Sequence, residues 1–167
     1  NGGVTRFGEK FIEEMNRLGM IIDVSHLTPA SFWDVIEYSE SPIVASHSNV
    51  KNICNHPRNL SDKQIEAIAE KEGLIGINFC PAFLREKGRP GVEDIVKHIQ
   101  YIKELVGIDY VCLGTDYDGI TQTPKKLDNI GKIPFLFQKL KEYNFTEREI
   151  KKLSRKNWLR VIEDILK

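Results

Sequence analysis

Three short apolar runs, each followed directly by a polar residue, constrain the fold of this chain more than any other feature. The runs are GMIIDVSH ending at His26, PIVASH ending at His47 and YVCLGTD ending at Asp116. Each is rich in β-branched or aliphatic residues and too short for a typical helix, so each predicts a buried β-strand. Residues able to bind metal or transfer protons therefore follow three predicted strands.

Helical patterns separate these strands. Apolar residues recur at three- and four-residue steps from Val92 to Leu105, which is typical of an amphipathic helix. Shorter helical patterns cover residues 11–18, 29–36, 61–69, 133–143 and the segment that begins at Thr146. Residues 74–79 predict a further strand, which ends before Cys80 because Pro81 cannot continue the ladder.

Four strands alternating with helices indicate an α/β fold, because parallel pairing needs crossover connections. Two architectures fit the count: half of a (β/α)8 TIM-type barrel, or an open doubly wound sheet. In β/α barrels the reactive side chains lie at the carboxyl ends of the strands, which is the position of His26, His47 and Asp116. No strand is followed by a Gly-rich phosphate-binding loop. We therefore expect the half-barrel.

Composition excludes several classes of function. The 167 residues contain 24 Lys and Arg and 24 Asp and Glu, so the chain lacks the positive charge that nucleic-acid binding requires. No apolar run approaches the roughly 20 residues that span a bilayer. Cys54, Cys80 and Cys112 form no close pair, and Cys80 and Cys112 lie in apolar runs, so we expect reduced cysteines and a cytoplasmic location. We predict a single domain over residues 1–167.

His26 and His47 are the strongest candidates for a metal site. Imidazole is the commonest protein metal ligand, and strand ends hold side chains in fixed positions. The alternative is that each histidine ends a strand and bonds a neighbouring loop. A catalytic zinc takes about three protein ligands and a water, so two histidines require at least one carboxylate from elsewhere.

Asp116 and Arg58 are candidates for chemistry beside such a metal. A carboxylate at a strand end can accept a proton and pass it to a leaving nitrogen, whereas the alternative for Asp116 is a turn residue in Asp-Tyr-Asp-Gly. The fork of Arg58 can hold a substrate carboxylate, and its alternative is a surface arginine. Asp23 alternates with apolar residues and could support a ligand or face a barrel interior.

Three other polar residues receive structural interpretations. Asp118 suits a turn, and His56 precedes a proline in a loop. His98 lies within a helical pattern between Lys97 and Ile99, so we expect it in a solvated or helix-packing position.

An ordered set of short motifs resembles one protein family over nearly the whole chain. The set resembles the carboxyl-terminal half of the membrane dipeptidase (renal dipeptidase) family, peptidase family M19. The motifs are Phe7-Gly8, Met15 to Met20, Ile22 to His26, Ser46 to Ser48, Arg58 to Asp62, Gly114 to Gly119 and Asn157 to Arg160.

The resemblance implies the second half of a (β/α)8 barrel from a binuclear zinc enzyme that hydrolyses dipeptides. His26 and His47 match the two histidine ligands of one zinc ion. Arg58 matches the arginine that binds the terminal carboxylate of the substrate, and Asp116 matches the aspartate that shuttles the proton. The family's His-x-Asp pair and bridging glutamate have no counterpart in this sequence, so we expect at most a partial zinc site and little or no activity from this chain alone.

Two other functions remain open. The chain could be a non-catalytic half-barrel fragment or pseudoenzyme, or part of another metal-dependent amidohydrolase. In every one of these cases the chain is half of a barrel, and its two edge strands would expose unpaired backbone groups. We therefore expect self-association, or pairing with an amino-terminal half, in addition to a dipeptide substrate.

Overall fold

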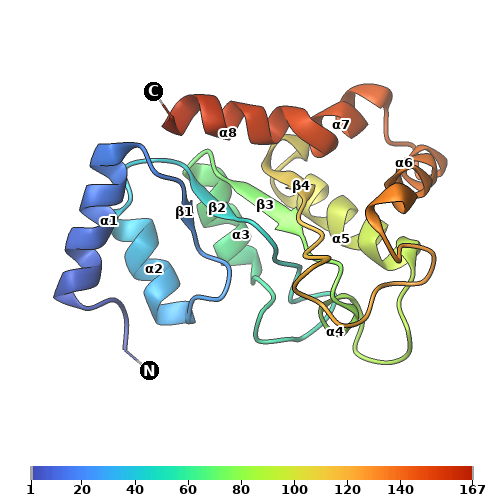
Figure 1. Cartoon of the computed structure of the whole chain (residues 1–167), viewed down its shortest axis with the longest axis horizontal. Helices are drawn as coiled ribbons and strands as arrows, with labels where there is room; N and C mark the ends of the chain where they lie inside the picture. Colours follow the sequence, from blue (N-terminus) through green and yellow to red (C-terminus); the bar gives the residue numbers. More distant parts are fainter. Residues whose placement is uncertain (1, 167) are drawn as a thin grey trace.

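The computed structural model describes residues 2–166 of the chain. Its four strands form one sheet in the order of the sequence, and every neighbouring pair is parallel. The strands are β1 (Ile22–Asp23), β2 (Ile43–Ala45), β3 (Leu74–Ile77) and β4 (Val111–Leu113). The predicted α/β fold, with four parallel strands alternating with helices, is confirmed (Figure 1).

The helices before and between the strands are α1 (Arg6–Leu18), α2 (Pro29–Tyr38), α3 (Asp62–Glu70) and α5 (Val92–Leu105). Their positions agree with the predicted helical patterns, except that α1 begins five residues earlier and α2 ends two residues later. Gly19 ends α1 with a left-handed φ of 66°, a conformation that costs glycine little. Thr28 caps α2 by accepting from the Ser31 N–H at 3.2 Å, and Pro29 takes the first helical position.

The first strand is shorter than its apolar run predicts. It was expected to continue to His26, but β1 ends at Asp23, so this boundary is wrong by three residues. The Asp23 carboxylate accepts from the Ser25 N–H at 3.0 Å, and the Leu27 N–H bonds to the Val24 carbonyl at 3.2 Å. These local bonds turn the chain before it can continue along β2. The other three strands, predicted over residues 43–46, 74–79 and 110–114, also end one or two residues earlier.

The sheet packs between a large and a small apolar cluster. The large cluster joins the sheet to α2, α3, α5 and α6 (Ile133–Glu142), and includes Phe32, Ile65, Ile99 and Leu136. The small one joins Val44, Leu74 and Cys112 to Val161 and Ile165 of α8 (Asn157–Ile165). In Figure 1, α8 runs across the top of the view, whereas the loops after β2, β3 and β4 lie on the opposite side around α4 (Pro81–Leu84). The sequence analysis did not predict α4.

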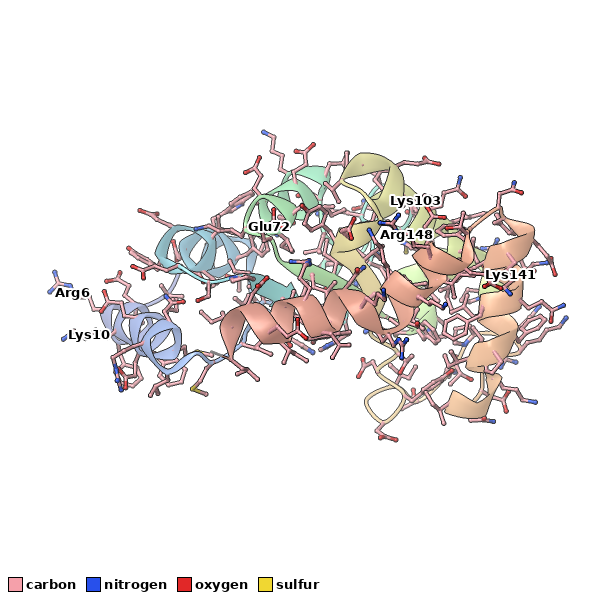
Figure 2. The ribbon with its side chains drawn as sticks, turned by 90° about the horizontal axis from the view of Figure 1, so that it is seen from above. Arg6, Lys10, Glu72, Lys103, Lys141 and Arg148 are labelled. Atoms are coloured by element: carbon pink, nitrogen blue, oxygen red, sulfur yellow. The ribbon has the colours of Figure 1, made fainter. Side chains whose placement is uncertain are left out.

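The carboxyl-terminal helical segment is held against the amino ends of β3 and β4. It comprises α7 (Glu147–Lys151), a π-helical turn at Lys152–Lys156, and α8. The Asn157 side-chain amide donates to the carbonyls of Ile108 and Val111 at 2.7 and 2.8 Å. The Arg160 guanidinium donates to the carbonyls of Glu72, Gly73 and Asp109. Glu72, Lys103 and Arg148 are labelled along this side of the molecule in Figure 2.

His98 of α5 lies in the core and links two loops on the site side of the sheet. It is 0% exposed, so of the two predicted positions the helix-packing one is correct and the solvated one is wrong. Its Nδ1 accepts from the Val50 N–H at 3.1 Å, and its Nε2 donates to the Leu84 carbonyl at 3.1 Å. Both bonds are made by a neutral ring, and burial lowers the pKa of His98 to about 4.

No helix within residues 2–166 is long and apolar enough to cross a membrane.

The neutral state of His98 makes the folded chain sensitive to mild acid. Its pKa is about 4 when folded and about 6.5 when unfolded, so the unfolded state binds the proton first as the pH falls. The stabilisation is therefore complete above pH ~6.5 and is lost between pH ~6.5 and 4, by about 1.4 kcal/mol per pH unit.

Urea unfolding at pH 7 and pH 5 measures this loss. We expect the His98→Gln variant, which cannot titrate, to lose about 2 kcal/mol less than the wild-type chain between the two pH values. An equal loss in both proteins would contradict the assignment to His98.

Candidate active site at the carboxyl ends of the strands

His26 and His47 meet at the carboxyl ends of β1 and β2. Parallel pairing in the register Ile22↔Ile43 and Asp23↔Val44 brings the segments that follow the two strands side by side. The Nε2 atoms of the two histidines are 2.8 Å apart and the ring centroids 4.9 Å apart. The sequence analysis placed these residues on one sheet edge, and the structure brings their rings into contact.

Two of the predicted site residues have unusual backbone conformations. His26 has φ of 77° and Asp116 has φ of 58°, a region that non-glycine residues occupy uncommonly. Such strain persists only where surrounding bonds impose it, and it concentrates at functional sites. At both positions the left-handed conformation occurs three residues after a strand ends.

Arg58 lies against His26 and has one unsatisfied nitrogen. Its Nη1 is 2.8 Å from Nδ1 of His26, and its guanidinium carbon is 5.5 Å from the centre of the Phe83 ring. Its Nη2 is buried and has no partner among the described residues. A buried donor without a partner is costly, so this nitrogen is suited to an anionic ligand. The interpretation of Arg58 as an ordinary surface arginine does not explain this burial.

The local environment keeps His26 from taking up a proton. Partial desolvation of the ring is the first cause that lowers the pKa of His26, followed by the positive charge of Arg58 and by His47. The carboxylates of Asp116 and Asp23 act in the opposite direction. The net direction is downward, so His26 keeps a neutral imidazole, the form that can bind a metal ion.

Asp116 is held by Asn78, a residue that the sequence analysis did not single out. Asn78 is 0% exposed, and its side-chain amide donates to Oδ2 of Asp116 at 3.1 Å. Asn78 is itself fixed by a reciprocal pair with Asn49: the Asn78 N–H donates to Oδ1 of Asn49, and Nδ2 of Asn49 donates to the Asn78 carbonyl, both at 3.0 Å. A polar residue directly after the apolar run of β3 was the available signal for Asn78.

Gly76 in β3 and Gly114 just after β4 leave room for the backbone beside His47. A Cβ atom on Gly76 would lie 2.0 Å from the Ser46 carbonyl oxygen, and one on Gly114 would lie 1.9 Å from the same atom. Only glycine at these two positions allows the Ser46 carbonyl oxygen to approach the neighbouring backbones so closely. The position of Ser46, and hence of His47, depends on both glycines. Their place near strand ends was the only signal in the sequence.

The two histidines fit part of a zinc site. Zinc holds imidazole nitrogens at about 2.0–2.1 Å, so two nitrogens on one tetrahedral ion lie about 3.3 Å apart. The two Nε2 atoms, 2.8 Å apart, would need to separate by only about 0.5 Å to share an ion. Within residues 2–166, no group of three or more His, Cys, Asp or Glu side chains could hold a metal ion. The pair can therefore supply two ligands, and a catalytic zinc needs about three.

The remaining candidates have structural contacts. Nδ1 of His56 accepts from the Arg58 N–H at 3.2 Å, and its ring packs 4.5 Å from that of Phe83, measured between centroids. Asp118 is exposed in a turn closed by the Gly119 N–H and the Asp116 carbonyl. Cys54 and Cys112 are buried, whereas Cys80 is only half-buried.

A parallel sheet with histidines, an arginine and an aspartate beyond its strand ends defines the class of β/α-barrel proteins whose sites lie at that edge. Within this class, the family model for membrane dipeptidase (peptidase family M19) matches residues 1–167. The chain belongs to this family.

Similar proteins extend the comparison. An uncharacterized protein of Klebsiella pneumoniae, named for the region 5' of pqqA, is 41% identical over 98% of this chain and 61% of its own length. An uncharacterized dipeptidase of Schizosaccharomyces pombe is 37% identical over 96% of this chain and 40% of its own length. The crystal structure of a metallo peptidase from Rhodobacter sphaeroides, liganded with a phosphinate mimic of the dipeptide L-Ala-D-Ala, matches with a TM-score of 0.94 and 33% identity, over 99% of this chain and 48% of that one. The chain thus spans about half the length of these proteins.

The close approach of Gly119 to Asp116 leads to a prediction about the position of the carboxylate. A Cβ atom on Gly119 would lie 2.1 Å from Oδ1 of Asp116. Since that oxygen ends a flexible side chain, we expect Gly119→Ala to rotate the carboxylate away from Asn78 while changing the free energy of unfolding by only about 1 kcal/mol or less.

Crystal structures of Gly119→Ala and of Gly2→Ala, a position with nothing within 4 Å of an added Cβ, test this. An unchanged contact between Asn78 and Asp116 in the Gly119 variant would show that the carboxylate is not confined from that side.

Proposed function

We propose that this chain supplies one half of the active site of a metal-dependent dipeptidase. The observation that carries the proposal is the meeting of His26 and His47, with Nε2 atoms 2.8 Å apart, beside an arginine with a free buried nitrogen. Membership of the M19 family and the likeness to a metallo peptidase bound to a dipeptide mimic support it.

His26 and His47 would hold a zinc ion through their Nε2 atoms, with further ligands and a second zinc ion from a segment outside these 167 residues. Bound zinc would supply a Lewis acid that polarises the peptide carbonyl and an activated water. The strand ends hold the two rings in place, and the neutral state of His26 keeps it available as a ligand.

Arg58 would select substrates with a free carboxylate. Nη2 is buried without a partner. The guanidinium lies over the Phe83 ring, and His56 holds the backbone N–H of Arg58. A carboxylate can accept from both guanidinium nitrogens at once. A dipeptide places its carboxylate one residue beyond the bond to be cleaved, so an arginine beside the metal ligands favours dipeptides over longer peptides.

Asp116 would carry the proton. It lies beyond β4 on the same edge of the sheet, and its charge acts on His26. The bond from Asn78 fixes one carboxylate oxygen, which leaves the other to accept a proton from the attacking water and donate it to the leaving amine.

Taken alone, the chain would be a non-catalytic half. Two histidine ligands are too few for a catalytic zinc, so we propose that activity requires pairing with the part of the barrel that carries the other ligands. Another amidohydrolase reaction is the alternative for the paired protein. Cyclic amides, which lack a free carboxylate for Arg58, assayed beside dipeptides distinguish the two reactions.

The test of the role of Asp116 uses the complete protein that contains this chain, loaded with zinc. We expect Asp116→Asn to lower kcat for dipeptide hydrolysis by about 10²–10⁴-fold, because it removes a general acid and base, while zinc content is unchanged. Asp118→Asn, in the same turn but exposed, is the matched control and should retain activity. If the zinc-loaded complete protein leaves dipeptides intact, the proposed function is wrong.

A separate prediction concerns Arg58. Arg58→Lys keeps the charge but loses the planar fork, so we expect KM for dipeptides to rise roughly tenfold or more, since a charge-assisted hydrogen bond contributes about 1.5–3 kcal/mol. Dipeptide amides, which lack the carboxylate, should be poor substrates of both enzymes. Equal KM values in the variant and the wild type would argue against carboxylate binding at this residue.

A further inference from the structure

We propose that Asp23, acting through Ser46, is a positioning residue that sets the tautomer of His47, with the ring proton on Nδ1 and the lone pair of Nε2 facing His26. The role of this tautomer in metal binding rests on the proposed function. The tautomer itself follows from hydrogen bonds within this chain.

The Asp23 carboxylate joins the two segments that carry the histidines. Its Oδ1 accepts from the backbone N–H groups of Ser25 and Ser46, both at 3.0 Å, and its Oδ2 accepts from the Ser46 hydroxyl at 2.5 Å. The bonds to Oδ1 hold the backbone after β1 beside the backbone after β2. The bond to Oδ2 uses the only hydroxyl proton of Ser46, so this hydroxyl cannot donate to a second group.

The committed proton determines the state of His47. Ser46 Oγ lies 2.7 Å from Nδ1 of His47. A hydroxyl has one proton to donate, and that of Ser46 points to Asp23, so this contact requires Nδ1 of His47 to donate. A neutral imidazole carries a single N–H, so Nε2 of His47 presents a lone pair.

The other end of the network agrees with this direction. A guanidinium only donates, so the contact of 2.8 Å between Arg58 Nη1 and His26 Nδ1 places the proton of neutral His26 on Nε2. That proton points to Nε2 of His47 at 2.8 Å. Donation therefore runs in one direction, from Arg58 through His26, His47 and Ser46 to Asp23. Reversing the tautomer of His47 alone would place two N–H groups against each other.

This arrangement prepares His47 and not His26 for binding through Nε2. Histidine ligands of metals usually donate their other N–H to a carboxylate or carbonyl, which fixes the ring and raises its basicity. For His47, the Ser46 hydroxyl accepts from Nδ1–H and donates in turn to the Asp23 carboxylate. Nδ1 of His26 has no such acceptor, because it faces the Arg58 guanidinium, which can only donate.

The experiment is long-range ¹H–¹⁵N NMR of the imidazole rings in the 167-residue chain, without metal, at pH about 8, where an ordinary histidine with a pKa of ~6.5 is neutral. We expect His47 to be in the Nδ1–H form. In Asp23→Asn, the amide nitrogen would donate to Ser46, freeing the hydroxyl proton to bond Nδ1 of His47. We therefore expect this variant to shift His47 toward the Nε2–H form and to separate the rings of His26 and His47, because two Nε2–H groups would otherwise face each other.

Ser46→Ala and Ser46→Thr keep the test decisive if Asp23→Asn does not fold. The alanine variant should hold less of the Nδ1–H form than the wild type, because only the contact with His26 then favours it, and the threonine variant, which retains a hydroxyl, should restore the wild-type proportion. Asp118→Asn is the control for loss of a carboxylate and should leave the tautomer unchanged. An Nε2–H form in the wild type, or the same tautomer in the wild type and in folded Asp23→Asn, would overturn the proposal.

A second measurement links the tautomer to the proposed function. In the complete protein, we expect Asp23→Asn to weaken zinc binding by about 10–100-fold, the usual effect of removing a support for a ligand. If the tautomer is as expected but the complete protein does not hydrolyse dipeptides, only the proposed function fails. If hydrolysis is normal but the tautomer is not as expected, only this inference fails.

Discussion

Parallel strand pairing in a fixed register is the constraint on which the rest of this structure depends. It places the residues after β1, β2, β3 and β4 along one edge of the sheet, so side chains far apart in the sequence become neighbours. The contact between His26 and His47 follows directly from the first pair of strands. A shift of one residue between β1 and β2 would send alternate side chains to opposite faces and would separate the two rings.

Residue patterns predicted the fold, and the shared sheet edge of the candidate site residues, because both depend on short-range signals. Capping by Thr28 and Gly19, and apolar runs of strand length, placed the helices and strands, and parallel pairing placed His26, His47 and Asp116 on one edge. The end of β1 was mispredicted because a side-chain bond from Asp23 to the next turn outweighs the apolar pattern. Asn78, Gly76 and Gly114 were missed because their importance lies in contacts with Asp116 and Ser46, in segments far away in the sequence. Their positions near strand ends were only a weak signal.

The two ends of the sheet are stabilised in different ways. At the amino ends, Val161 and Ile165 of α8 pack on Val44 and Leu74, and Arg160 and Asn157 bond backbone carbonyls. At the carboxyl ends, buried polar side chains hold the loops: His98 bonds two of them, and Asn49 and Asn78 bond each other. Such networks specify one arrangement of the loops because each member loses its partner in any other. The loops at the carboxyl ends of the strands are therefore held in one arrangement. One of their hydrogen bonds, from the Val50 N–H to His98, is lost when acid protonates the His98 ring.

The contact between Arg58 and His26 links two binding events. Any ligand that takes the lone pair of Nε2 on His26 moves the ring proton to Nδ1, where the guanidinium can no longer donate. Arg58 must then leave the ring, and its nitrogens become available together. By thermodynamic reciprocity, an anion that draws Arg58 away strengthens binding of a cation at His26 by the same factor. Under the proposed function, metal and carboxylate would thus bind cooperatively, because both break the same hydrogen bond between Arg58 and His26.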